Sequence, residues 1–232
     1  MHITIPWAER RDGRFDIHEL DIEPSNTALL IVDVQRGYVE PEAGVGPTLK
    51  GHPDIFNYYY PRLSDVVLPN IVRLIDFFRA HGLEVVFTRQ GFMTPDARDL
   101  PPWNWRHAQV GTREARIFWV GSPEAELMPE LAQADDLIVD KSSSGPFATS
   151  GLDQYLRNMS IENVVIAGVL TNVAVETAAR DAGDRGYNVI AVDDACAAYW
   201  PEEHSDTMAT ASWWVAKSTE TVVTELTPGL GH

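Results

Sequence analysis

Several features are scarce in this 232-residue chain, and each scarcity narrows what the protein can be. The chain has one cysteine, Cys196, which excludes an intrachain disulfide and any metal site built from several cysteines. No apolar run approaches the roughly 20 residues that a membrane-spanning helix needs. The first 16 residues lack the apolar core of a secretory signal peptide, so we expect a cytoplasmic protein that does not associate with a membrane.

Positive charge is also scarce. The sequence has 18 Lys and Arg residues against 34 Asp and Glu residues, and the formal net charge is −16. A chain with this excess of negative charge repels polyphosphates, which argues against nucleic acid or an anionic membrane as a partner. Hydrophobic residues make up 44% of the chain, which is typical of a globular protein and too high for a disordered one.

What the sequence does contain is an alternation of short apolar runs and helical patterns. We expect strands at Thr27–Val34, Leu83–Thr88, Leu137–Asp140, Asn163–Gly168 and Asn188–Asp193. We expect helices at Pro61–Gly82, Thr149–Asn158, Asn172–Arg185 and Pro201–Lys217, and an edge strand at Thr221–Thr224. Strands that alternate with helices pair in parallel through right-handed crossovers. The sequence therefore predicts one α/β domain over residues 1–232, doubly wound, with a mainly parallel sheet flanked by helices on both faces.

Three segments fall outside this alternation. Residues 1–24 are expected to be an N-terminal extension, residues 40–60 are rich in Gly, Pro and aromatics, and residues 90–123 are expected to be a long loop insertion. The insertion contains large aromatic residues, among them Trp103, Trp105, Phe118 and Trp119. Because such side chains are costly to leave in water, we expect a pocket wall or a subunit interface rather than surface decoration.

The chemistry should lie at the carboxyl ends of the strands, where open parallel sheets bind their ligands. Asp33 ends the first strand, where partial burial suits a carboxylate to general acid or base work; capping the following turn is an equally good explanation. Lys141 ends the third strand, and it is either a solvated surface lysine or a partner for Asp33. After the fourth strand, Gly168 leads directly into a helix, whose free N–H groups can bind an oxyanion. A thiol at the start of this helix would have a lowered pKa and would be a better nucleophile, but the residue there is Ala174.

Taken together, these segments resemble the isochorismatase-like hydrolases, also called the cysteine hydrolase superfamily. The resemblance covers residues 25–223 and rests on ALLIVDVQRGY, VVFTR, DKSSSGPFATSGLDQYL, VVIAGVLTNVAVETAARDAGDRGYNVIAVDDACAA and EEHSDTMA, in this order and spacing. Within this family, the sequence most resembles the ureidoacrylate, biuret and N-carbamoylsarcosine amidohydrolases.

The resemblance implies a catalytic triad of Asp, Lys and Cys. The aspartate maps onto Asp33 and the lysine onto Lys141, while Ala174 occupies the position of the nucleophilic cysteine. The family also has a cis peptide bond that maps onto Val169–Leu170. This bond turns the N–H groups of Leu170 and residue 174 inward as an oxyanion hole.

Three explanations for Ala174 remain open. The first is an engineered Cys→Ala change that traps substrate in an amidohydrolase of small amide or ureido compounds. The second is a natural member without a thiol, since isochorismatases proper lack the cysteine and cleave a vinyl ether with the aspartate as proton donor. The third is a ligand-binding pseudoenzyme. The remaining thiol, that of Cys196, is expected to be a small buried side chain with no catalytic role.

The resemblance also bears on ligands and assembly. Some members bind a metal through an Asp-x-His pair and a further histidine after the first motif. In this chain that region offers His52 and no Asp-x-His pair, so we expect no metal and no cofactor. The family is commonly oligomeric, which predicts a homo-oligomer, a dimer or a tetramer. Candidate substrate contacts lie after the first motif and in the insertion: Gln35, Tyr38, Trp103, Trp105, Arg106, Phe118 and Trp119.

Overall fold

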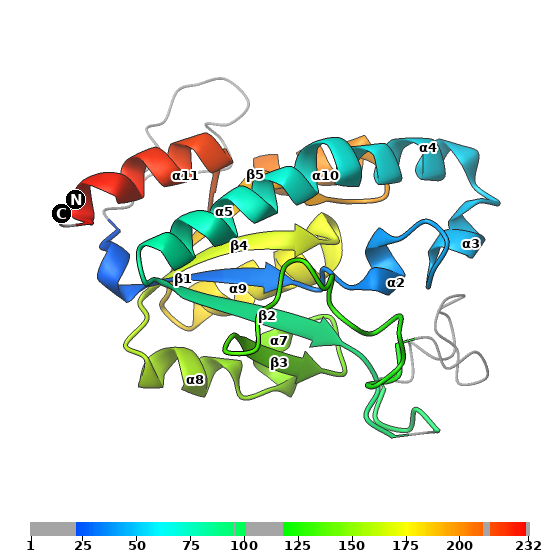
Figure 1. The fold of residues 1–232 in the computed structure, drawn as a ribbon, viewed down its shortest axis with the longest axis horizontal. Helices are drawn as coiled ribbons and strands as arrows, with labels where there is room; N and C mark the ends of the chain where they lie inside the picture. The colour runs from blue at the N-terminus through cyan, green and yellow to red at the C-terminus, as the bar shows by residue number, and fades with distance from the viewer. Residues whose placement is uncertain (1–21, 95, 101–117, 211–213, 231–232) are drawn as a thin grey trace.

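The computed structural model describes residues 22–94, 96–100, 118–210 and 214–230. Its centre is a six-stranded, entirely parallel sheet in the order β3-β2-β1-β4-β5-β6 (Figure 1). The strands are β1 (Thr27–Val32), β2 (Glu84–Gln90), β3 (Leu137–Lys141), β4 (Asn163–Val169), β5 (Asn188–Ala197) and β6 (Val215–Lys217). The predicted doubly wound α/β fold is confirmed.

The two central strands explain why this sheet is stable. Every residue of β1 and β4 is buried, as expected for runs of β-branched and aliphatic residues covered on both faces. Alternate residues of β1 contribute to two separate cores, with Leu29 and Ile31 in one and Leu30 and Val32 in the other. Val32 pairs with Thr88 of β2 and Gly168 of β4, so three strand ends lie side by side at one edge.

Helices cover both faces of the sheet (Figure 1). One core is formed with α4 (Pro53–Arg62), the π-helical turn η2 (Leu63–Val67), α5 (Leu68–Ala80) and α11 (Thr219–Leu226). The other is formed with α7 (Pro146–Thr149), α8 (Leu152–Asn158), α9 (Glu176–Asp184) and α10 (Pro201–Thr210). Short elements complete the described chain: η1 (Pro24–Asn26), α2 (Arg36–Val39), α3 (Gly46–Leu49), the π-helical turn η3 (Thr171–Val175) and η4 (Thr227–Gly229).

Two predicted elements near the C-terminus are wrong. The helix expected over Pro201–Lys217 ends at Thr210, and Val215–Lys217 instead adds the edge strand β6 to the sheet. The edge strand expected at Thr221–Thr224 lies inside helix α11. Ser218 explains this difference, because its side chain accepts the N–H of Thr221 and so caps the helix. Val222 and Leu226, four residues apart, are then both fully buried.

Residues 40–60, which fall outside the predicted alternation of strands and helices, are largely helical, since they contain α3 and most of α4. Pro53 begins α4 in the first turn, where a missing N–H costs nothing. The helix predicted from Pro61 is instead the continuation of α4 through η2 into α5, and Pro69 lies in the first turn of α5. These helices bring Tyr59 and Arg62 toward the carboxyl end of the sheet.

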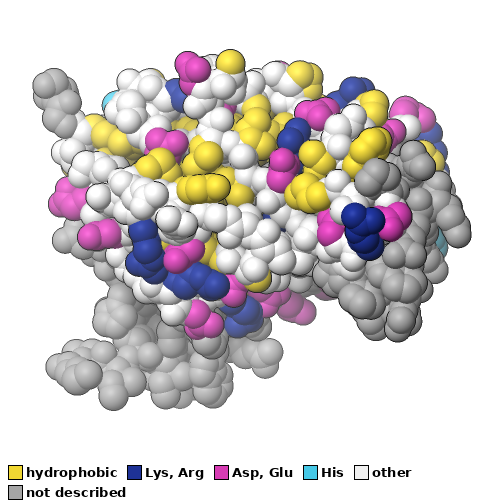
Figure 2. Space-filling view, turned by 90° about the horizontal axis from the view of Figure 1, so that it is seen from below, with side chains coloured by type: hydrophobic (Ala, Val, Ile, Leu, Met, Phe, Trp, Pro, Cys, Tyr) yellow, Lys and Arg dark blue, Asp and Glu magenta, His cyan; other side chains and the backbone are white. Residues whose placement is uncertain are grey.

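The surface of the described chain shows charges of both signs close together. On the face in Figure 2, Lys and Arg side chains lie next to Asp and Glu side chains instead of forming a patch of one sign. Ion pairs between residues four apart on one helix include Arg157–Asp153, Arg180–Glu176 and Arg185–Asp181. Among the helices of the described chain, none has the length and apolar character that crossing a bilayer requires.

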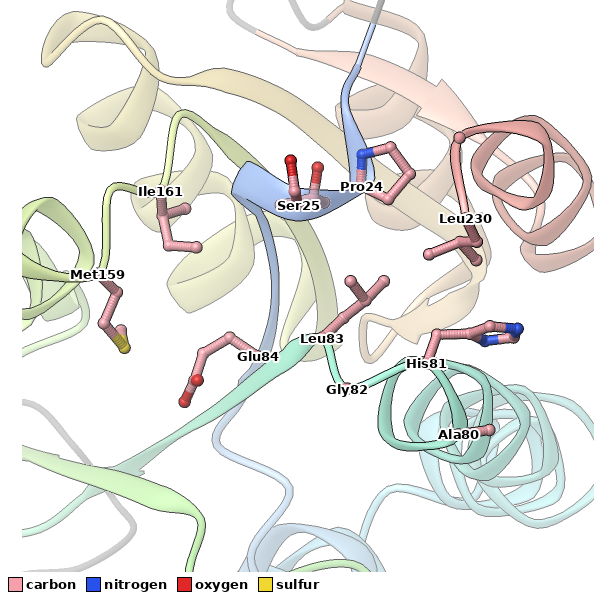
Figure 3. A pocket seen from close by; sticks show the side chains of 12 residues that line it. Pro24, Ser25, Ala80, His81, Gly82, Leu83, Glu84, Met159, Ile161 and Leu230 are labelled. Carbon is pink, nitrogen blue, oxygen red and sulfur yellow. The ribbon is translucent and has the colours of Figure 1, made fainter. Parts of the chain in front are cut away.

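A pocket of about 630 Å³ lies at the opposite edge of the sheet from the strand ends described above. Figure 3 shows Pro24 and Ser25 on one side of it and His81, Leu83 and Glu84 on the other, with Met159 and Ile161 nearby. These residues precede the strands or follow the helices that lead into them. Parallel α/β sheets bind their ligands at the carboxyl ends of the strands, so the active site is expected at the other edge of this sheet.

Candidate active site

Asp33 lies at the carboxyl end of β1, and only 1% of the residue is exposed. Its backbone is in the left-handed region, with φ 53°, a conformation that Asp and Asn adopt more readily than other L-residues. Thr88, at the neighbouring strand end, donates its hydroxyl to Asp33 Oδ1 at 2.7 Å. This hydroxyl fixes one carboxylate oxygen and leaves the other for a second partner.

That second partner is Lys141, at the end of β3. Its side chain is fully buried, and Nζ donates to Asp33 Oδ2 at 2.7 Å. The remaining hydrogens of Nζ are directed at the carbonyl oxygens of Ser143 and Ser144, at 2.9 and 3.0 Å. The solvated surface lysine that we considered from the sequence is therefore wrong, and the structure brings Asp33 and Lys141 together across the end of β2.

Burial shifts the proton affinities of this pair in opposite directions. Loss of solvent raises the pKa of Asp33, although Lys141 and Thr88 oppose the rise by stabilising the carboxylate. Loss of solvent likewise lowers the pKa of Lys141, and the charge of Asp33 opposes that change. Both shifts favour the neutral forms, so Asp33 accepts a proton at a smaller free-energy cost than an exposed carboxylate does.

The fourth strand brings a turn to the same edge. Gly168 has φ 128°, and a Cβ there would lie 2.1 Å from the Val32 carbonyl oxygen, so only glycine permits this close approach to β1. The Val169–Leu170 peptide bond that follows is cis. The turn η3 then carries Ala174, which is 3% exposed and packs with Val32 and Val175 in one of the two cores. Residue 174 thus lies in the turn that follows β4, and β4 is paired with β1.

Gln35 is placed differently from our expectation of a substrate contact. The residue is fully buried, and its Nε2 donates to the carbonyl oxygens of Gln90 and Ala125 at 2.8 and 2.7 Å. Its Oε1 accepts the N–H of Gln90 at 2.9 Å. The amide is thus bonded to backbone groups on both sides, which ties the ends of β1 and β2 to the segment around Ala125.

Gln35→Ala is expected to lower the free energy of unfolding by about 2–3 kcal/mol, because it leaves buried backbone groups of Gln90 and Ala125 without partners. Chemical denaturation measures the loss. Gln133→Ala is the matched control, since the Gln133 side chain is exposed, and it should leave the midpoint nearly unchanged. Equal midpoints for the two variants would contradict the anchoring role of Gln35.

The remaining predicted substrate contacts divide into two groups. Trp103, Trp105 and Arg106 lie outside the described residues. Tyr38 stacks on Phe118, with ring centroids 4.4 Å apart. Trp119, the next residue, forms an isolated parallel β-bridge with Phe92. Burial and the nearby charge of Asp33 raise the pKa of Tyr38 well above its usual value, so its hydroxyl is a neutral group next to the carboxylate.

Two further tyrosines stand beside Tyr38 and were not identified from the sequence. Tyr59 of α4 is fully buried, and its hydroxyl has no hydrogen-bond partner in the described part of the chain. Its ring lies edge-on to that of Tyr199, which follows β5, with centroids 5.0 Å apart. Burial raises the pKa of Tyr59, and the neighbouring Tyr199, Tyr60 and Tyr38 raise it further. Nothing in the local sequence around Tyr59 indicates that its helix reaches this edge.

Metal ligation finds little support in the described residues. Among them no group of three or more His, Cys, Asp or Glu side chains is arranged to hold an ion. His204, one of the isolated histidines of the sequence, is bonded instead to Thr171 and Asp193. The expectation of a site without metal or cofactor stays a prediction.

Cys196 is fully buried in β5, as expected, and burial raises the pKa of its thiol to about 12. We therefore expect iodoacetamide at pH 8 to leave the folded chain unmodified, whereas the same reagent in denaturant modifies it completely, because only the thiolate reacts. Intact-protein mass spectrometry distinguishes the two states. Rapid modification of the folded chain would show that Cys196 is an accessible nucleophile.

The comparisons with known proteins agree with this geometry. A family model described as the isochorismatase domain matches residues 27–224. A protein of Bacillus subtilis, the uncharacterized isochorismatase family protein YwoC, is 32% identical over 83% of this chain and 88% of its own length. The ureidoacrylate amidohydrolase RutB of Acinetobacter baylyi is 27% identical over 79% of this chain and 76% of its own. The crystal structure of a cysteine hydrolase from Pseudomonas syringae pv. phaseolicola superposes with a TM-score of 0.78, at 24% identity, over 92% of this chain and 98% of that one.

Proposed function

Because this chain belongs to the isochorismatase family, we propose that its site is that of an amidohydrolase, built to cleave a C–N bond of a small amide or ureido compound. The observation that carries the proposal is the buried Asp33–Lys141 pair at the edge where residue 174 follows β4. A family that includes ureidoacrylate amidohydrolases supports the same reaction class. We further propose that Ala174 leaves the chain able to bind substrate but unable to turn it over by a covalent route.

With a thiol at position 174, the reaction would proceed in two steps. Asp33 takes the thiol proton, the thiolate adds to the substrate carbonyl, and the amine departs with that proton as the C–N bond breaks. Water then adds to the thioester while Asp33 accepts its proton, and the acid leaves as the thiol is restored. The N–H groups of Leu170 and residue 174 would stabilise the oxyanion in both steps. The methyl group of Ala174 cannot perform the first step.

The tyrosines suggest what kind of group binds beside Asp33. The Tyr59 hydroxyl is buried without a hydrogen-bond partner in the described chain, and raised pKa values keep the hydroxyls of Tyr38, Tyr59 and Tyr199 as neutral donors. A buried donor without a partner costs about 1–3 kcal/mol, which a substrate carbonyl would recover. We therefore assign recognition of the substrate's uncharged carbonyl groups to this cluster. In the same proposal Gln35 positions the strand ends and makes no contact with substrate.

A second candidate function is supported by the chemistry of Asp33 itself. Cleavage of a vinyl ether needs a proton donor and a water molecule but no nucleophilic side chain. Burial raises the pKa of Asp33, which suits it to hold and deliver a proton, and Ala174 would then be an ordinary residue of the site. A binding protein without catalysis is the outcome that remains if neither reaction occurs.

One experiment separates these functions. The chain and its Ala174→Cys variant are incubated with a panel of amides, ureas, biuret and N-carbamoyl amino acids, and ammonia release is measured; isochorismate hydrolysis is followed in parallel. We expect ammonia only from the variant. Hydrolysis of isochorismate by the unaltered chain would establish the second candidate, and inactivity of both proteins in both assays would overturn the amidohydrolase proposal.

A further inference from the structure

A chain of hydrogen-bonded side chains runs from the first residue of η3 to the protein surface. Thr171 Oγ1 lies 2.9 Å from His204 Nδ1, and His204 Nε2 lies 2.6 Å from Asp193 Oδ1. Thr171 is fully buried and His204 is 6% exposed, whereas more than half of the Asp193 side chain is exposed. Three separate elements, η3, α10 and β5, therefore meet through these side chains beside the turn that carries residue 174.

The protonation of His204 follows from its neighbours. The hydrogen bond from His204 lowers the pKa of Asp193, so Asp193 is an ionised group that can only accept. Nε2 must then carry the proton of this bond. In neutral His204 this leaves Nδ1 as the acceptor, and the Thr171 hydroxyl donates to it.

Arg62 favours the opposite arrangement. Its Nη2 lies 2.8 Å from the same Nε2, and a guanidinium can only donate. Donation from Arg62 would require a bare Nε2 and a protonated Nδ1, which would donate to Thr171 instead. Arg62 is held in place by the carbonyl oxygens of Cys196 and Asp193, at 3.0 and 3.1 Å. Asp193 and Arg62 thus compete for the two neutral forms of one ring.

We propose that Asp193 and His204 are positioning residues that fix the Thr171 hydroxyl as a donor and thereby hold the Leu170–Ala174 turn at the end of β1. Leu170 is the start of this turn, since its carbonyl oxygen accepts the N–H groups of Val173 and Val175 at 3.1 and 3.2 Å. Thr171 is the next residue, so its side-chain bond sets the direction in which the turn leaves the sheet. The inference rests on the proposed function, because residue 174 is its target.

The tautomer of His204 is the first test. The full chain is labelled with ¹⁵N-histidine, and long-range ¹H–¹⁵N spectra are recorded at a pH where His204 is neutral, with its signals assigned through His204→Gln. We expect a protonated Nε2 in the unaltered chain. We expect a protonated Nδ1 in Asp193→Ala, because Arg62 is then left to donate to Nε2. The same tautomer in both proteins would overturn the proposal.

The reactivity of a thiol at position 174 is the second test. In the Ala174→Cys background, Thr171→Val is expected to lower the second-order rate constant for iodoacetamide about tenfold, since misplacement by 1 Å can cost more than this. Thr171→Ser keeps the hydroxyl, so its rate constant should stay within about twofold of that of the parent. This change is much smaller than the tenfold change that corresponds to 1.4 kcal/mol.

The matched control is Thr227→Val. The Thr227 hydroxyl donates to the Val223 carbonyl oxygen at 2.6 Å, a bond that involves neither the Leu170–Ala174 turn nor the His204 network. Its loss should leave the rate within about twofold of the parent, less than the tenfold change that corresponds to 1.4 kcal/mol. Circular dichroism of each variant verifies folding. A Thr171→Val variant that folds and reacts as fast as its parent would overturn the proposal. Alkylation needs no substrate, so a failure of ammonia release contradicts the proposed function without deciding this inference.

Discussion

Ala174→Cys is expected to raise ammonia release from a suitable amide or ureido substrate by at least about 10³-fold over the unaltered chain. Removing a nucleophile that acts together with its base typically costs several orders of magnitude in turnover, and restoring it should recover a comparable factor. The proposed base, Asp33, is already held by Thr88 and Lys141 in an environment that raises its pKa. The substitution adds one sulfur atom at a residue that is 3% exposed.

Two controls determine whether the gain comes from the proposed chemistry. Cys196→Ala in the Ala174→Cys background should leave ammonia release unchanged, because the native thiol is buried with a pKa of about 12. Asp33→Asn in the same background should remove the gain, because an amide cannot take the thiol proton. A variant that keeps its ammonia release without the Asp33 carboxylate would contradict the assignment of Asp33 as the base.

The sequence predicted the sheet and the ends of its strands better than the chain's C-terminal part. Apolar runs such as Thr27–Val32 are long enough to specify a buried strand without help from the rest of the molecule. The segment around Thr221 is ambiguous, because two valines followed by threonine are compatible with a strand. Its helical state depends on the cap from Ser218 and on burial against the sheet, and the latter is a tertiary effect that local propensity does not contain.

The site was predictable to the extent that it lies on strand ends. Asp33 and Lys141 could be identified because parallel topology brings such ends together, and the family resemblance that these motifs indicated is confirmed. Thr88, His204 and Tyr59 could not be identified, because their contacts depend on strand register and on helix packing between residues 33 to 140 positions apart. Gln35 shows the limit of this reasoning: its position two residues after Asp33 is plain from the sequence, but its backbone partners depend on the folded chain.

The buried Asp33–Lys141 pair makes the second large prediction. Asp33→Asn and Lys141→Met are each expected to lower the free energy of unfolding by about 3–5 kcal/mol, because each leaves the other group buried without its partner. Asparagine suits the left-handed backbone at residue 33, so the first variant tests the charge and not the turn. Urea denaturation measures both losses. The exposed pair Lys50–Glu42 serves as the control, and Lys50→Met should have little effect.

The double variant Asp33→Asn/Lys141→Met should regain most of the stability lost by either single variant, because no buried charge is then left unpaired. Losses that simply add would show that the two groups do not interact. The Asp33–Lys141 pair is thus expected to add little to the free energy of unfolding compared with uncharged side chains. Stability of the fold therefore does not explain why these two charged residues are present. We expect the double variant in the Ala174→Cys background to be stable and inactive, which would separate the catalytic role of the pair from its role in the fold.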